Sequence, residues 1–250
     1  MLNRRYAVLL GVLAISSCGS THEQTGAVSP VPSGPTANES EARLRAMTRR
    51  LANARTFTLH ATREVDAALT ETGAEPELAD LFFEVKRPDR VHIVSRTKEA
   101  TQHLYFDGRS VVLYNETDRV YATLPVTGPI DSMISALNAN IGYIPPLAQF
   151  ILNDSWPAFQ EQLKGGGDTL NEPIGGMECQ RVRLMGMRAI AYIWVAPQNN
   201  LPCALTATFA DVEGDPQVRV RFLEWNFTPQ LSDGAFRFNP PAGTRAVPMD

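Results

Sequence analysis

The feature of the sequence that most constrains the fold is a two-residue alternation of apolar and polar side chains. Over residues 57–62, Phe, Leu and Ala occupy the odd positions and Thr, His and Thr the even ones. Similar short runs cover residues 81–85, 91–93, 104–106, 111–114 and 121–124, and Asp107-Gly108 is a hairpin signal between two of them. Successive side chains of a strand point to opposite faces, so the runs predict an antiparallel, strongly curved sheet.

The alternation returns in the last third of the chain. Strand-like runs cover residues 177–184, 190–195, 203–209 and 218–222, and Phe236 and Phe238 complete the pattern. The run 190–195 is apolar at every position, which is typical of a central strand covered on both faces. The phase of the alternation slips near Glu224, which predicts a β-bulge there.

Between the two series lies a weakly charged segment with helical spacing. Pro129 precedes apolar residues at helical intervals over 130–137, and the spacing recurs over 147–151 and 155–163, before the three glycines 165–167. These helices either fill the concave face of the sheet as core or form a movable lid over an apolar cavity.

A further helix is predicted at the start of the domain, because Asn38 and Glu41 have the spacing of a capping box. Leu44, Met47 and Leu51 then fall on one stripe, as in an amphipathic helix laid against a sheet. Arginines 43, 45, 49, 50 and 55 lie mostly off that stripe, on a face that is either solvated or in contact with anionic lipid. The predicted fold class is therefore α+β, with a curved antiparallel half-barrel sheet wrapped over helices in a single domain from 38 to 250.

The N-terminus has the form of an exported lipoprotein. Asn3-Arg4-Arg5 is a basic head, and residues 6–15 form an apolar run that is too short to span a membrane but suits a signal peptide. Ile15-Ser16-Ser17-Cys18 resembles the bacterial lipobox, whose cysteine is lipidated and becomes residue one. An ordinary secretory signal with a chance cysteine is the alternative.

This interpretation divides the N-terminal region into two parts. We predict a signal peptide over residues 1–17 and a tether over 18–37 that carries acyl chains, palmitate among them, on Cys18. Between residues 19 and 37, 12 of 19 residues are Gly, Ser, Thr or Pro, a composition typical of a flexible linker. Because Gly19 follows the cysteine, we expect attachment to the membrane at the periplasmic face of the outer membrane.

Two cysteines remain if Cys18 carries lipid. Cys179 and Cys203 would then be an even pair in an oxidising compartment, which favours a disulfide. The bridge would close a loop of 203 − 179 = 24 residue steps. Two buried thiols are the alternative.

Five short motifs carry a family resemblance over roughly residues 39–245. They are Arg87-Pro88-Asp89-Arg90, Tyr105-Phe106-Asp107-Gly108, Val120 to Pro125, Trp194 through Leu201-Pro202, and Phe238 to Gly243. In this order and spacing they resemble the bacterial predicted periplasmic family called domain of unknown function 2092. That family is similar in architecture to the outer-membrane lipoprotein carriers, so the resemblance implies a half-open barrel over helices and, more weakly, lipid binding.

Several classes of function are not expected. The net charge is −4, with 23 basic and 27 acidic residues, so the chain has no basic footprint for nucleic acid. It contains no Gly-x-Ser-x-Gly, His-Glu-x-x-His or phosphate-binding glycine loop, and its four histidines show no ligand spacing. We therefore expect no enzyme activity, no cofactor and no metal, and the sequence leaves the oligomeric state open.

Two hypotheses of function remain. In the first, a membrane-anchored periplasmic lipoprotein binds a lipid or a lipoprotein acyl chain in a cavity between the sheet and the helices. The predicted lining residues are Leu59, Phe83, Ile93, Phe106, Ile134, Leu137, Phe150, Tyr192, Trp194 and Phe222. In the second, the domain is a protein-interaction or sensor module of the cell envelope with a filled core and no ligand.

Overall fold

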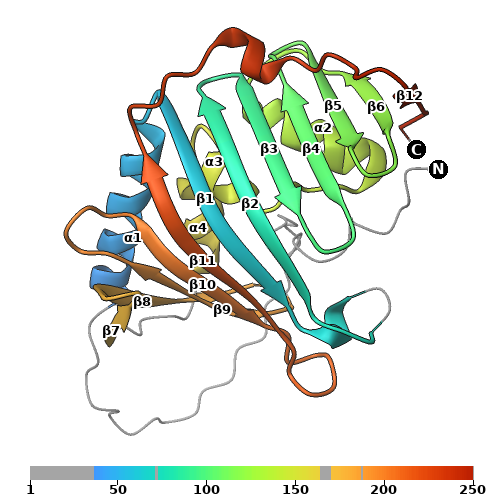
Figure 1. Cartoon of the computed structure of the whole chain (residues 1–250). Helices are drawn as coiled ribbons and strands as arrows, with labels where there is room; N and C mark the ends of the chain where they lie inside the picture. The colour runs from blue at the N-terminus through green and yellow to red at the C-terminus, as the bar shows by residue number, and fades with distance from the viewer. Residues whose placement is uncertain (1–36, 71–72, 164–169, 187, 250) are drawn as a thin grey trace, which may run out of the picture.

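The computed structural model describes residues 37–70, 73–163, 170–186 and 188–249. The described residues form one open, twisted sheet of 12 strands with helices on its concave side (Figure 1). The strand order is β12-β6-β5-β4-β3-β2-β1-β11-β10-β9-β8-β7. The α+β half-barrel that the sequence predicts is confirmed, and all pairs of the described strands are antiparallel except the short parallel pair of β12 and β6.

The first series of alternating residues forms six consecutive antiparallel strands. They are β1 (Thr56–Val65), β2 (Glu77–Lys86), β3 (Arg90–Arg96), β4 (Thr101–Phe106), β5 (Ser110–Asn115) and β6 (Val120–Pro125). Short turns join each of the strands β2 to β5 to the next strand in the chain. Gly108 in the β4–β5 turn has a φ of +86°. A side chain at Gly108 would clash with Asp89, so the Asp107-Gly108 turn needs glycine for both reasons.

The second series forms the other half of the sheet. Its strands are β7 (Leu170–Ile174), β8 (Met177–Met185), β9 (Ile190–Val195), β10 (Pro202–Thr208) and β11 (Gln217–Asn226). Strand β11 pairs with β1 and thereby joins the two halves. The register of that pair shifts where His60 faces Glu224 and Ala61 faces Phe222, which confirms the predicted bulge and leaves Leu223 unpaired.

Four helices and two short 3-10 turns complete the described part of the fold. They are α1 (Ala37–Ala52), α2 (Ile130–Ile141), α3 (Ala148–Ile151), α4 (Trp156–Gln162), η3 (Ala67–Leu69) and η4 (Asp233–Phe236). Helix α2 begins after Pro129 and ends at Gly142, which has a φ of +65° and donates its N–H to the carbonyl of Asn138. Helix α1 begins at Ala37, so Asn38 lies inside the helix and the predicted capping box is wrong.

The core lies between the concave face of the sheet and these helices. Leu44, Met47 and Leu51 of α1, Met133 and Leu137 of α2 and Phe159 of α4 are fully buried in it. Phe150 of α3 packs against Phe159 and Phe222, with ring centroids 5.7 Å and 5.0 Å away. The three middle helices therefore fill the concave face as core in the region that they cover.

Cys179 and Cys203 form the predicted disulfide. Their Cα atoms are 6.7 Å apart, and both residues are buried beside Ala196 in a small cluster of their own. The bridge connects β8 to β10 across the intervening strand β9.

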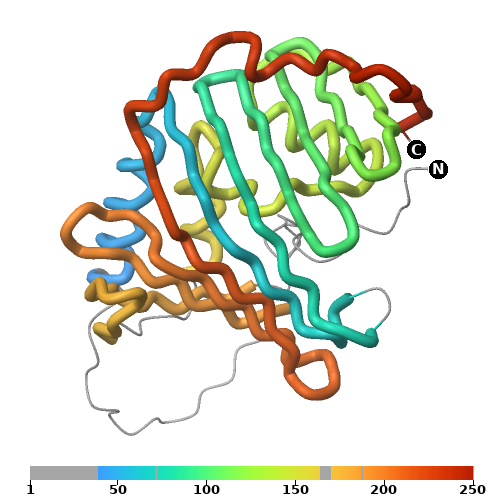
Figure 2. The backbone as a smooth tube through the Cα atoms, in the orientation of Figure 1, coloured from blue at the N-terminus to red at the C-terminus, as the bar shows by residue number. Residues whose placement is uncertain are grey.

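After β11 the chain crosses back over the sheet as a strap, residues 227–247, which Figure 2 shows along the rim to the opposite edge. Asp233 of the strap pairs with Lys86 at 2.7 Å and with Arg90 at 3.6 Å. Phe238 lies on the outer face with its ring centroid 4.9–5.5 Å from those of Tyr105, Tyr114 and Tyr121. The strap ends in β12 (Arg245–Ala246), which pairs with β6.

Candidate functional site

Seven of the predicted lining residues lie between the concave side of the sheet and the helices, five of them on strands and two on helices, and all seven are buried in the core. Their exposed fractions lie between 0% and 6%. They are Leu59, Phe83, Ile93, Phe106, Leu137, Phe150 and Phe222. Side chains this inaccessible leave no room for a ligand among them, so the cavity expected beneath the middle helices is filled by core packing.

Tyr192 and Trp194 are on the opposite face, and their prediction as lining residues is wrong. Strand β9 alternates between buried and half-buried residues instead of being covered on both faces. Ala191, Ile193 and Val195 point into the core, while Tyr192 lies under the guanidinium of Arg181. The Trp194 indole donates a hydrogen bond of 2.8 Å to Glu172. These two rings cover the outer side of the sheet beside the disulfide.

The concave face changes character along its strands. Towards the β2–β3 turn its cross-strand rows are apolar and closed, for example Leu59, Phe83, Ile93 and Leu104. The next row towards the other end contains Ser95, Gln102 and Asn115, which face one another across β3, β4 and β5 and are only half-buried. Cross-strand partners share a face, so this row is a polar, partly open part of the concave surface.

Arg63 of β1 lies beyond that row and also points to the concave side. Its neighbours in the inward register are Ala61 and Val65, both buried. Arg63 pairs with Glu77 of β2, and the side chain of Arg63 is only 15% exposed. The Nε–H of Arg63 is buried and has no hydrogen-bond partner among the described residues. A buried guanidinium donor without a partner costs free energy, which an acceptor that reached it would recover.

Tyr143 follows α2 and lies near Arg63. Burial raises the pKa of Tyr143 to about 12, and the positive charge of Arg63 opposes this shift. Tyr143 packs against the core together with the half-buried residues Ile134, Ile141 and Leu113. The predicted lining residue Ile134 is therefore half-buried at the surface of the core.

We call Arg63, Glu77, Tyr143 and the polar row of Ser95, Gln102 and Asn115 the polar end of the concave face. The arrangement sets one buried cation and several neutral hydrogen-bonding groups beside apolar surface, which suits an amphiphile with an acidic head. The sequence interpretation missed Arg63. The signal was present, because the odd positions 57, 59 and 61 predict that position 63 also points inward.

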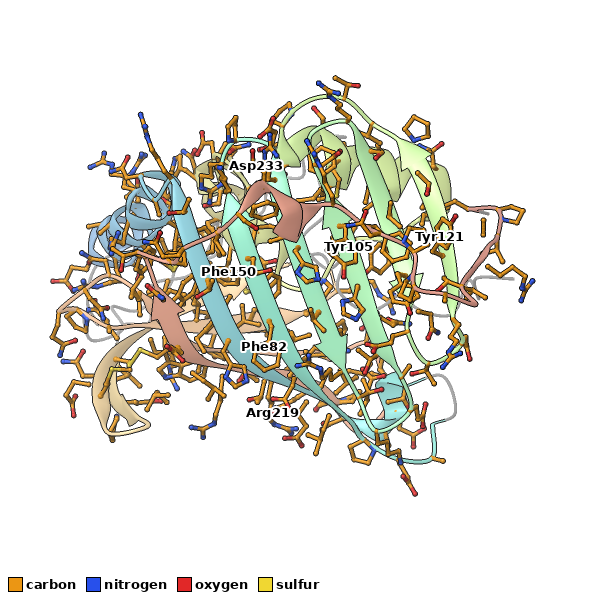
Figure 3. All side chains as sticks on the ribbon, turned by 45° about the horizontal axis from the view of Figure 1, so that its top comes forward. Phe82, Tyr105, Tyr121, Phe150, Arg219 and Asp233 are labelled. Atoms are coloured by element: carbon orange, nitrogen blue, oxygen red, sulfur yellow. A yellow bond between two sulfur atoms is a disulfide. The ribbon has the colours of Figure 1, made fainter. Side chains whose placement is uncertain are left out.

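The outer face has a separate hollow of about 380 Å³, lined in part by His60, Phe82, Glu84, His92 and Arg96. Figure 3 labels Phe82, Tyr105 and Arg219, which lie on this face. The rings of His60 and Phe82 stack there with centroids 4.2 Å apart, as do those of His92 and Tyr105. The His92 and His103 rings connect Glu84 to Glu116 through contacts of 2.8 Å, 3.3 Å and 3.0 Å. Among residues 37–70, 73–163, 170–186 and 188–249, no three His, Cys, Asp or Glu side chains are grouped so that they could hold a metal ion.

The predicted lipidation site, Cys18, lies outside the described residues, as do the predicted signal peptide and the tether through residue 36. Among the helices that the structure describes, none is long and apolar enough to cross a membrane.

Comparison with solved structures finds several chains to which this one is similar. An uncharacterized conserved protein from Thermus thermophilus matches with a TM-score of 0.50 and 10% identity, over 84% of this chain and 99% of that one. Lipoprotein LppX of Mycobacterium tuberculosis matches with a TM-score of 0.43 and 11% identity, over 79% and 100% of the two chains. A LolA superfamily protein from Nitrosomonas europaea matches with a TM-score of 0.34 and 11% identity, over 78% and 97%.

These structural similarities concern the fold alone. No curated protein matches the sequence. The model of one protein family, described as predicted periplasmic protein (DUF2092), matches residues 40–250. The match spans almost the whole of the domain that the structure describes, and the chain therefore belongs to this family of predicted periplasmic proteins.

Proposed function

We propose that the protein binds a lipid-like amphiphile at the polar end of the concave face and serves the cell envelope as a carrier or receptor for it. The observation that carries the proposal is Arg63, an arginine that points into the concave side with a buried Nε–H that lacks a partner among the described residues. A carboxylate or phosphate head group would accept from this donor, and charge-assisted hydrogen bonds are the strong ones.

Half-buried apolar side chains of the core support a lipid rather than a small polar ligand. Leu113, Ile134 and Ile141 are half-buried and lie on the core that the helices close. An acyl chain laid over such surface would remove its methylene groups from water at about 0.8 kcal/mol each. A chain of roughly a dozen methylenes would offer on the order of 10 kcal/mol before ordering costs, which is enough for micromolar binding.

The test compares two arginines on opposite faces of the sheet. Arg63→Met removes the inward cation, whereas Arg219→Met removes an outer-face arginine that is also paired with acids, Glu64 and Asp66. We expect Arg63→Met to weaken the binding of a fluorescent fatty acid by about 10- to 100-fold. This factor corresponds to the loss of one hydrogen bond to a charged group. Arg219→Met should bind like the wild type.

Native mass spectrometry of the wild-type protein would show directly whether a lipid is retained. If the wild type neither retains lipid nor binds the fluorescent probe, or if both variants bind as well as it does, the proposal fails. Matched thermal melts of the three proteins separate loss of binding from loss of folding.

A protein-interaction or sensor module is the second candidate. The observation in its favour is the closed packing of the seven buried lining residues, whose 0–6% exposure leaves most of the concave face unavailable to a ligand. The same experiment distinguishes the candidates, because an interaction module would bind no lipid probe.

We also propose that Cys18 is lipidated and holds the domain at the periplasmic face of the outer membrane. The support is the lipobox Ile15–Cys18 together with membership of a predicted periplasmic family. Cys18→Ala should take up no labelled palmitate and leave an uncleaved or soluble species. Equal labelling of wild type and variant would exclude a lipid on this cysteine.

A further inference from the structure

Helix α1 turns a basic face away from the core. Its buried residues are Ser40, Leu44, Met47, Thr48 and Leu51. At 3.6 residues per turn, the opposite side of the helix carries Ala42, Ala46 and Arg49, with Arg45 and Arg50 on its two flanks, and Asn53 follows directly after the helix. Ala42, Arg49 and Asn53 are exposed. The side chains of the two alanines are short, so a flat surface can approach the helix backbone closely between the arginines.

Three arginines at the end of this helix have no acidic partner in the described part of the chain. Arg49 and Arg55 are exposed, and the guanidinium of Arg50 lies 3.8 Å above the ring of Phe227. By contrast, Arg45 pairs with Glu41 at 2.8 Å, and Arg43 donates hydrogen bonds to Gln180 and Asn200. Arg49 and Arg50 in the last turn also interact favourably with the helix dipole. Arg55 lies beyond the helix, so this interaction stabilises it little.

The position of α1 in the molecule adds a second argument. It is the first described element, and it lies at one side of the domain (Figure 1). The predicted anchor Cys18 precedes Ala37 by 37 − 18 = 19 positions. Nineteen residues reach at most about 65 Å whatever their conformation, so a chain anchored at Cys18 keeps this helix within that distance of the bilayer.

We propose that the outward face of α1, with Arg49, Arg50 and Arg55, docks on an anionic phospholipid surface. The acyl anchor would hold the protein on the membrane, and α1 would fix which side of the domain faces the bilayer. An acidic membrane fits better than a solvated face, because the chain as a whole has a net charge of −4 and yet leaves these three cations without an acidic partner in its described part. This inference concerns orientation and does not depend on lipid binding at the polar end of the concave face.

The test uses residues 18–250 with Cys18→Ser, which contain every described element and lack the lipid that would mask weak docking. Co-sedimentation is measured with vesicles of phosphatidylcholine alone and of phosphatidylcholine mixed with phosphatidylglycerol. Each arginine near an anionic surface raises partitioning about fivefold. The triple variant Arg49→Gln, Arg50→Gln, Arg55→Gln should therefore lose about 100-fold in partitioning to the mixed vesicles.

A matched triple variant controls for net charge. Arg109→Gln, Arg237→Gln and Arg245→Gln remove three exposed arginines from other parts of the surface. This control should bind the mixed vesicles like the parent chain, and binding of the parent should fall as NaCl is raised. Equal losses in both triple variants, or no preference of the parent for the mixed vesicles, would overturn the proposal.

Discussion

At the scale of single residues, the chain separates two kinds of large apolar side chain that look alike in the sequence. Phe150 is fully buried between helix and sheet, while Trp194 covers the outer face. Their types do not reveal this difference, since aromatic residues serve core and surface alike. The strand register does, because Ile193 points into the core and its neighbours Tyr192 and Trp194 must therefore point outward.

Phe150 provides a test of its place in the core. Phe150→Ala should lower the free energy of unfolding by about 3–5 kcal/mol, because it removes a buried ring and leaves a cavity. Leu223→Ala, at a position that is 52% exposed, should stay within roughly 0.5 kcal/mol of the wild type. Urea titrations of both variants provide the measurement. A Phe150→Ala protein as stable as the wild type would contradict complete burial of this ring.

At the scale of elements, alternation and helical spacing predict most of the architecture. The runs over 81–85 and 190–195 and the slip near Glu224 correspond to β2, β9 and the observed bulge. The open question about the middle helices could not be decided from periodicity, because an apolar stripe has the same spacing on a core helix and on a lid. The decisive quantity is the exposure of the residues beneath the stripe, which depends on how the sheet curves.

His103 on β4, whose ring contacts His92 on β3, is expected to make the stability of the domain depend on pH. Burial lowers the pKa of His103, nearby His92 and Arg96 lower it further, and Glu116 opposes them. The unfolded chain therefore takes up a proton on this side chain more readily than the folded one. The contribution of His103 to the free energy of unfolding is fully present above a pH of about 6.5, the pKa of the unfolded chain. It is lost as the pH falls through the lower pKa that His103 has in the folded protein.

We therefore expect the urea midpoint to fall between pH 7 and pH 5, and the fall to be smaller in His103→Gln. One group contributes at most about 1.4 kcal/mol per pH unit to this slope. The comparison is made between wild type and variant at each pH, so acids that titrate in both cancel. An identical slope in the two proteins would mean that His103 carries none of the dependence.

At the scale of the whole molecule, the C-terminal strap covers what the sheet would otherwise expose. It places Phe238 on three tyrosines of the outer face and pairs β12 with the edge strand β6. An uncovered edge strand is a template for pairing with another chain. The strap thus protects both a row of aromatic rings and one of the two edges of the sheet.

Truncation of the strap tests this role. A chain that ends after Thr228 should self-associate and unfold at lower urea concentration, as measured by light scattering after size exclusion and by urea titration. A shorter truncation after Thr244 removes only β12 and the few residues after it, and should free the edge of β6 while Phe238 remains in place. A long truncation that stays monomeric and stable would show that the strap has no protective role.

The junction between β1 and β11 has a consequence for the order in which the domain can assemble. Strands β1 to β6 pair with their neighbours in the chain, and so do β7 to β11, so each half can form through local contacts. Among the described strands, the two halves of the sheet pair only through β1 and β11, where Val65 faces Val218 from 153 positions away (218 − 65 = 153). Closing so long a loop is slow, and contacts distant in sequence form late. The middle helices acquire their complete covering only at that step, after the last long strand of the chain has become available.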